Sequence, residues 1–147
     1  MGLLIDGFAC VILSLIVIED IRRFRIRNGW VLSLVALFAV SCIVGNAEVS
    51  WIWHAVFAAI VLVAMLGAFH LRLIGAGDAK LLSAASLWIG PEGATTFAVA
   101  LLSLTILYCL GAITDMLPKR RAGEKIEIPF APSIAVAWLA TIAITYV

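Results

Sequence analysis

Most of this chain is apolar, and short polar segments divide the apolar sequence into runs. Hydrophobic residues make up 65% of the 147 residues and charged residues 13%, and the mean hydropathy is +1.18. Soluble globular domains contain about 45–50% apolar and about 25% charged residues, so this composition excludes that class. It predicts an integral membrane protein whose runs are helices, because lipid offers the backbone no hydrogen-bond partners.

The polar segments define six expected transmembrane helices, which form a single all-α domain over residues 1–147. We expect the spans at about 3–18, 29–44, 51–71, 78–89, 94–114 and 131–147. The fourth is short, since ~13 residues at 1.5 Å per residue reach only about 20 Å. A bilayer core is about 30 Å thick. We expect this segment to be a true span that begins below the cytoplasmic surface, rather than a re-entrant one.

The basic residues are distributed unevenly between the loops. All 10 Lys and Arg residues lie in, or just beside, the loops that follow the first, third and fifth spans. The loops after the second and fourth spans carry Glu48 and Glu92 instead. The positive-inside rule therefore places both termini on the non-cytoplasmic side of a multi-pass protein of the inner membrane. The net charge of +1 carries no information about partners. We expect membrane lipid around the spans and no nucleic-acid partner.

Two aspartates lie at the cytoplasmic edge on this topology. Asp20 closes the first span, and Asp78 opens the fourth within Gly75-Ala76-Gly77-Asp78-Ala79-Lys80. A carboxylate close to the bilayer core is costly and indicates a functional site. Two carboxylates that approach each other cannot easily both ionise, so one stays protonated while the other acts as a base. Such a pair can activate water and hydrolyse an amide without a metal.

The helix ends suggest a role for each aspartate. Asp78 is expected at the N-cap of the fourth helix, where the helix dipole favours the ionised form and hence the base. Asp20 lies near the C-terminus of the first helix, which favours the protonated form and hence the acid. Taken singly, Asp20 could be an interfacial residue paired with a nearby arginine or lysine, and Asp78 a plain N-cap.

Other residues around the Asp78 segment are candidate supports. Gly75 and Gly77 provide backbone freedom or close helix contact, or they form a plain turn. Lys80 either orients one of the aspartates or extends toward the membrane surface. Metal-ligand spacing is absent from the three cysteines and two histidines, so we expect no metal and no cofactor; these residues are Cys10, Cys42, Cys109, His54 and His70.

Three motifs resemble those of one known family. Gly75-Ala76-Gly77-Asp78-Ala79-Lys80 is similar to the G-x-G-D-x-K motif of type IV prepilin peptidases, the GxGD membrane aspartyl proteases. Asp20 followed by Ile26-Arg27-Asn28 resembles D-x5-I-P-N, and Ile128-Pro129-Phe130-Ala131-Pro132 resembles the I-P-F-A-P that opens the last helix of the family. The motifs occur in the right order on six expected spans and cover essentially the whole chain.

The resemblance implies that Asp20 and Asp78 are the catalytic pair. It implies supporting roles for Asn28, Gly75, Gly77, Lys80, Pro129 and Pro132. Family members remove the basic leader of prepilin or pseudopilin substrates on the cytoplasmic side, without a metal. The chain has neither the N-terminal cytoplasmic domain nor the C-x-x-C pairs of the bifunctional members, so it resembles the short, peptidase-only branch associated with Flp/Tad-type pili and secretion. Arg27 replaces the proline of I-P-N, and we expect this loss to loosen the loop.

Three other functions are compatible with the sequence. The archaeal preflagellin peptidases are a second short branch with the same motif. A small ion or solute transport subunit could use Asp20 and Asp78 as ion sites. The chain could also be a non-catalytic assembly protein of a pilus or secretion machine. The glycine-interrupted site has no counterpart in the other half of the chain, which argues against a transporter built from inverted repeats. The sequence makes no prediction of the oligomeric state.

Overall fold

The structure is a computed structural model that describes residues 2–44, 50–113, 120–122, 125–127 and 129–145. Its helices are α1 (Gly2–Arg23), α2 (Asn28–Val44), α3 (Trp51–His70), α4 (Ala76–Ile89), α5 (Ala94–Ile113) and α6 (Ala131–Thr145). Two short strands, β1 (Arg120–Ala122) and β2 (Lys125–Glu127), lie between α5 and α6. The predicted span ends at 114 and 147, the Glu48 loop and Lys119 lie outside the described residues.

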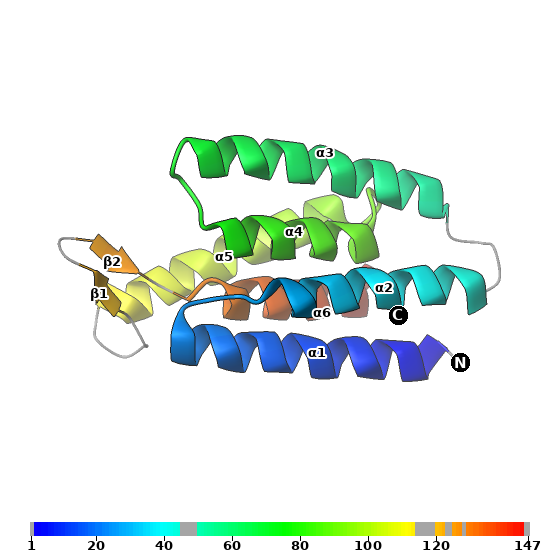
Figure 1. Ribbon diagram of the computed structural model, residues 1–147, viewed down its shortest axis with the longest axis horizontal. Helices are drawn as coiled ribbons and strands as arrows, with labels where there is room; N and C mark the ends of the chain where they lie inside the picture. Colours follow the sequence, from blue (N-terminus) through cyan, green and yellow to red (C-terminus); the bar gives the residue numbers. More distant parts are fainter. Residues whose placement is uncertain (1, 45–49, 114–119, 123–124, 128, 146–147) are drawn as a thin grey trace.

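The six helices lie side by side, and successive helices run in opposite directions (Figure 1). The α1–α2 loop, the α3–α4 loop and the β1–β2 pair lie at one end, and the two chain ends lie toward the other. The six expected helices are present in the described residues, while their passage through a membrane and the side that the termini face stay predictions. The sequence predicted only a polar loop between the fifth and sixth helices. The structure has two strands there, and Arg120–Ala122 pairs antiparallel with Lys125–Glu127.

Helix α4 is the buried centre of this bundle. It contacts α2, α3, α5 and α6, and Leu81, Ala85 and Ile89 have no exposed surface. Many of its buried residues are Ala or Ser, and such small side chains let neighbouring helices approach closely. Packing on several sides therefore holds the first turn of α4, which carries Asp78, at the end of the bundle where the basic loops gather.

The outer helices expose apolar side chains. α3 and α5 are long and apolar enough to cross a membrane, with mean hydropathies of 2.3 and 1.9, and only 6% of each span is buried. α2 and α6 are apolar but shorter. Trp53, for example, is 63% exposed. An apolar surface of this kind matches a lipid environment rather than water.

Two helix ends differ from the sequence prediction around the aspartates. α1 continues beyond residue 18 to Arg23, so Asp20 lies in its last turn, and Phe24 ends the helix with a left-handed φ of 50°. α4 begins at Ala76 with Gly75 as its N-cap. The prediction of Asp78 as the N-cap is therefore wrong, because the helix starts earlier and Asp78 lies within its first turn.

Candidate active site

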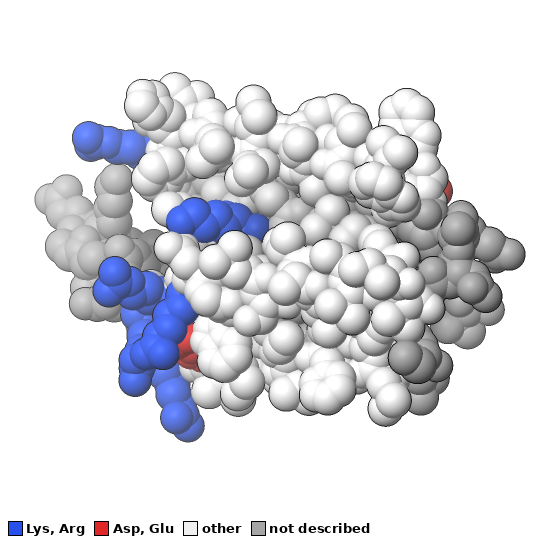
Figure 2. All heavy atoms as spheres, turned by 45° about the vertical axis from the view of Figure 1, so that its right-hand side comes forward, with Lys and Arg blue, Asp and Glu red and all other residues white. Residues whose placement is uncertain are grey.

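A cleft of about 1230 Å³ opens at the end of the bundle that carries the basic loops. Its walls are the end of α1, the α1–α2 loop, the α3–α4 loop, the start of α4, and Phe130. Figure 2 shows the Lys and Arg side chains gathered at this end of the molecule. The charged residues that line the cleft are Glu19, Asp20, Arg23, Arg25, Arg27, Arg72, Asp78 and Lys80. Helices that are distant in sequence thus bring both predicted aspartates into one cleft.

Asp20 is 5% exposed and lies two residues beyond the predicted end of the first span. The backbone N–H of Ala131, at the start of α6, donates a hydrogen bond to Asp20 Oδ2 at 3.0 Å. Burial raises the pKa of the Asp20 carboxyl, while the amides of Ala131 and Phe130 oppose that rise. This carboxyl is therefore desolvated but supplied with hydrogen-bond donors.

Asp78 lies in the polar first turn of α4, before the apolar sequence that begins at Leu81. Burial, and to a lesser extent the charge of Asp20, raise the pKa of its carboxyl to about 6, against the opposing effect of the Gly75 amide. A third helical residue that reaches back to the N-cap amide is the acidic half of a capping box. Both carboxyls line the same cleft, so a negative charge on Asp20 disfavours ionisation of Asp78.

The two glycines of the motif are sites of close approach. Neither has a positive φ; Gly90 is the glycine with one among the described residues. A Cβ on Gly75 would lie 2.9 Å from Asp78 Oδ2, and a Cβ on Gly77 would lie 3.1 Å from Ile26 Cβ. Close contact, rather than backbone freedom, therefore explains why glycine fits these positions.

Of the other predicted supporting residues, Lys80 and Asn28 line the cleft, whereas Pro129 and Pro132 do not. Lys80 Nζ donates a hydrogen bond to Asn28 Oδ1 at 2.9 Å, so Lys80 pairs with an amide at the cleft wall and not with a carboxylate. Pro129 is fully buried, and Pro132 is the second residue of α6. Of the described residues in this motif, Phe130 lines the cleft, while the two prolines do not.

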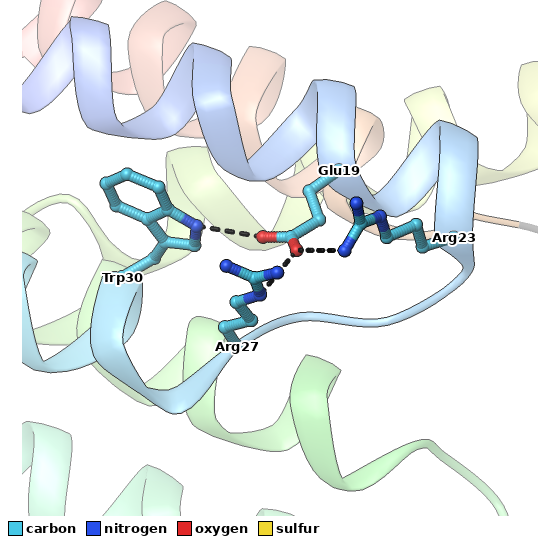
Figure 3. Close-up of polar contacts among 4 residues, drawn as sticks. All are labelled: Glu19, Arg23, Arg27 and Trp30. Atoms are coloured by element: carbon cyan, nitrogen blue, oxygen red, sulfur yellow. Dashed lines mark hydrogen bonds and ion pairs between the residues drawn. The ribbon is translucent and has the colours of Figure 1, made fainter.

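Glu19 is a cleft residue that the sequence analysis did not identify. Its carboxylate accepts a hydrogen bond from Trp30 Nε1 at 2.8 Å and forms ion pairs with Arg27 Nε at 2.8 Å and Arg23 Nη1 at 3.8 Å (Figure 3). Arg27, which replaces the proline of the motif, is thereby tied to α1. The sequence predicted a looser loop after loss of the proline. The Arg27–Glu19 ion pair is a contact that opposes such loosening. The i, i+4 spacing of Glu19 and Arg23 was the available signal.

The arrangement suits acid–base chemistry by two carboxyls. The one with the lower pKa ionises first, and its charge keeps the proton on the other. Across the described ranges, no group of three or more His, Cys, Asp or Glu residues is placed to hold a metal ion.

Comparison with known families finds one family whose model covers much of the chain. The model of the type IV leader peptidase family matches residues 7–114, a range that includes Asp20, Asp78 and most of the cleft wall but ends before α6. No curated protein and no solved structure gives a significant match. Because the family match covers well over half of the chain, the protein belongs to the type IV leader peptidase family and is a membrane-embedded protease.

Proposed function

We propose that this protein is a prepilin leader peptidase that uses Asp20 and Asp78 as its catalytic pair. The observation that supports this most strongly is the cleft itself: both carboxyls line it, and the charge of one raises the pKa of the other. The family match makes the protein a protease, and these are the two aspartates that line the cleft.

The proposed reaction is the hydrolysis of one peptide bond by a carboxylate and a carboxylic acid. The carboxylate takes a proton from water as the water oxygen bonds to the carbonyl carbon, and the acid gives its proton to the carbonyl oxygen. When the tetrahedral intermediate collapses, the C–N bond breaks and the first proton passes to the leaving nitrogen. The hydroxyl proton of the intermediate returns to the second carboxyl, which restores the pair.

The proposed placement is a six-span protein of the inner membrane with both termini on the non-cytoplasmic side. The gathering of basic side chains at the cleft end supports a cytoplasmic position for the cleft. The apolar outer surfaces of α3 and α5 support contact with lipid. A leader that precedes an apolar substrate segment would then reach the cleft from the cytoplasm.

The proposed substrates are prepilins or pseudopilins of the Flp/Tad type. The three motifs in their order support a substrate of the prepilin class. An archaeal-type preflagellin peptidase would use the same pair, so a panel of both substrate types distinguishes the two functions.

The test is co-expression of the chain with a candidate prepilin, followed by detection of leader removal. Asp20→Asn and Asp78→Asn should each abolish cleavage, and chelators should leave the wild-type reaction intact. Asp6→Asn is the matched control, because Asp6 lies on the exposed surface of the same helix as Asp20, near the opposite end. Normal cleavage by either active-site variant would exclude that aspartate from the pair, and flux of an ion without cleavage would favour transport.

A further inference from the structure

The start of α6 contacts Asp20, although the two are separated by 111 positions in the sequence. The C-terminus of α1 disfavours a negative charge on Asp20. In the structure the N–H of Ala131, the first residue of α6, meets Asp20 Oδ2 at 3.0 Å, and the Phe130 amide also favours the charged carboxylate. Asp20 therefore lies at the negative end of one helix and the positive end of another.

The amide of Ala131 is free to bind a carboxylate because of its position. The first N–H groups of an α-helix have no acceptor within the helix. Pro132 has no N–H at the next position, so Phe130 and Ala131 carry the N–H groups of the segment from 130 to 132. Ala131 has no exposed surface, which keeps water from competing for its N–H.

We infer that the Ala131 amide positions Asp20 in the cleft and holds it ionised, so that Asp20 is the base and Asp78 is the acid. This inference rests on the proposed function and reverses the roles expected from the ends of α1 and α4 alone. Asp20 then takes the proton from water, and Asp78 keeps its proton for the carbonyl oxygen. The pKa of Asp78, raised to about 6 partly by the charge of Asp20, is consistent with this order.

Other charged groups line the same cleft as Asp20 or lie near it, and they belong to the same electrostatic balance. From the elements packed around it, the titratable and charged residues are Glu19, Arg23, Arg25, Arg27, Arg72, Asp78, Lys80 and Tyr108. Glu19 already binds Trp30, Arg23 and Arg27, and Lys80 binds Asn28. The backbone amides of Ala131 and Phe130 are the donors to the Asp20 carboxylate that favour its charged form.

The test removes the Ala131 N–H and leaves the side chain intact. Ala131→lactic acid, introduced by nonsense suppression, replaces the amide with an ester of nearly the same shape. Ala135→lactic acid is the matched control, because Ala135 is the same residue one turn further along α6 and is also buried. The pH dependence of prepilin cleavage is then measured for wild type and both ester variants.

Loss of the donor should move the acidic limb of the cleavage profile upward by about one pH unit, because a hydrogen bond to a charged group is lost. The control ester should leave that limb in place. Infrared spectra with ¹³C-labelled aspartate should show the Asp20 carboxylate band titrating at a correspondingly higher pH, a result that requires no activity.

Three results would overturn the inference. An unchanged profile and carboxylate band in the Ala131 ester variant would show that its amide does not hold Asp20 ionised. If the ester shifted the alkaline limb of the cleavage profile instead, the group that lost its donor would be the catalytic acid, and Asp20 would be that acid. Absence of cleavage by the wild-type enzyme would contradict the proposed function itself, and the inference with it; wild-type cleavage with an unchanged ester profile would contradict the inference alone.

Discussion

At the scale of single residues, the two aspartates have different surroundings. Asp20 receives backbone donors from Phe130 and from Ala131 at the start of α6, whereas the pKa of Asp78 is raised to about 6 by burial and by the charge of Asp20. This coupling leads to a prediction about ionisation that requires no substrate.

Asp20→Asn should lower the pKa of Asp78 from about 6 toward its ordinary value of 3.8, because removing a nearby negative charge makes ionisation easier. The pH dependence of the carboxyl stretching band in ¹³C-aspartate-labelled protein measures this change. Asp6→Asn should leave the Asp78 band where it is. A band at the wild-type pH in Asp20→Asn would show that burial alone sets the pKa of Asp78.

Gly75→Ala should impair cleavage more than it impairs folding. Its Cβ would lie 2.9 Å from Asp78 Oδ2, so the carboxylate must shift, and a displacement of about 1 Å in a catalytic group can cost on the order of 100-fold in rate. Gly29→Ala is the control, because a Cβ there meets nothing within 4 Å. Steady-state cleavage rates on a prepilin substrate measure this difference. Equal rates for Gly75→Ala and Gly29→Ala would contradict the close contact at Gly75.

The sequence predicted the two aspartates of the cleft but neither Glu19 nor the partners of these residues. Asp20 and Asp78 stood out because each interrupts or borders an apolar run. The partner of Lys80 could not be read in the same way, because Asn28 meets it only when α2 packs on α4. The Ala131 donor was hidden for a similar reason, since backbone amides carry no sequence signal beyond the start of a helix.

At the scale of the elements, apolar runs predicted all six helices, but polar residues near their ends blurred the boundaries. The first apolar run ends at residue 18, but α1 continues through Glu19 and Asp20 to Arg23. Gly75, rather than Asp78, is the N-cap of α4, and the Asp78 carboxylate reaches back to it from within the helix. The β1–β2 pair had no apolar alternation to reveal it.

The loop between α1 and α2 should depend on Glu19 more than on any one arginine. Glu19→Ala should lower the free energy of unfolding by about 1.5–3 kcal/mol, because it removes the hydrogen bond from Trp30 to a charged group. Arg27→Ala should cost less than about 1 kcal/mol, since the Arg27 side chain is 61% exposed. Denaturation in detergent micelles measures both values. A larger loss in Arg27→Ala than in Glu19→Ala would contradict the central position of Glu19 shown in Figure 3.

Arg25→Ala is the matched control for Arg27→Ala. Arg25 lies in the same loop and is exposed, and none of the ion pairs among the described residues includes it. Its replacement should leave the free energy of unfolding within about 0.5 kcal/mol of wild type.

At the scale of the whole molecule, the antiparallel arrangement places the end of α1 and the starts of α4 and α6 at the same end of the bundle (Figure 1). The positions of the basic residues in the sequence predicted this shared end. They could not predict that α4 is the buried centre with contacts to four helices, because its short length and small residues also suited a peripheral segment. Because α4 is central, its first turn brings Asp78 into the same cleft as Asp20.

The most direct test of the account is a double-mutant cycle on purified enzyme with a prepilin peptide. Asp20→Asn and Asp78→Asn should each reduce the single-turnover rate by at least about 100-fold. The double variant should be no slower than the slower single variant, because groups that act as one unit are lost together. A wild-type rate in either single variant, or losses that multiply in the double variant, would contradict a catalytic pair formed by Asp20 and Asp78.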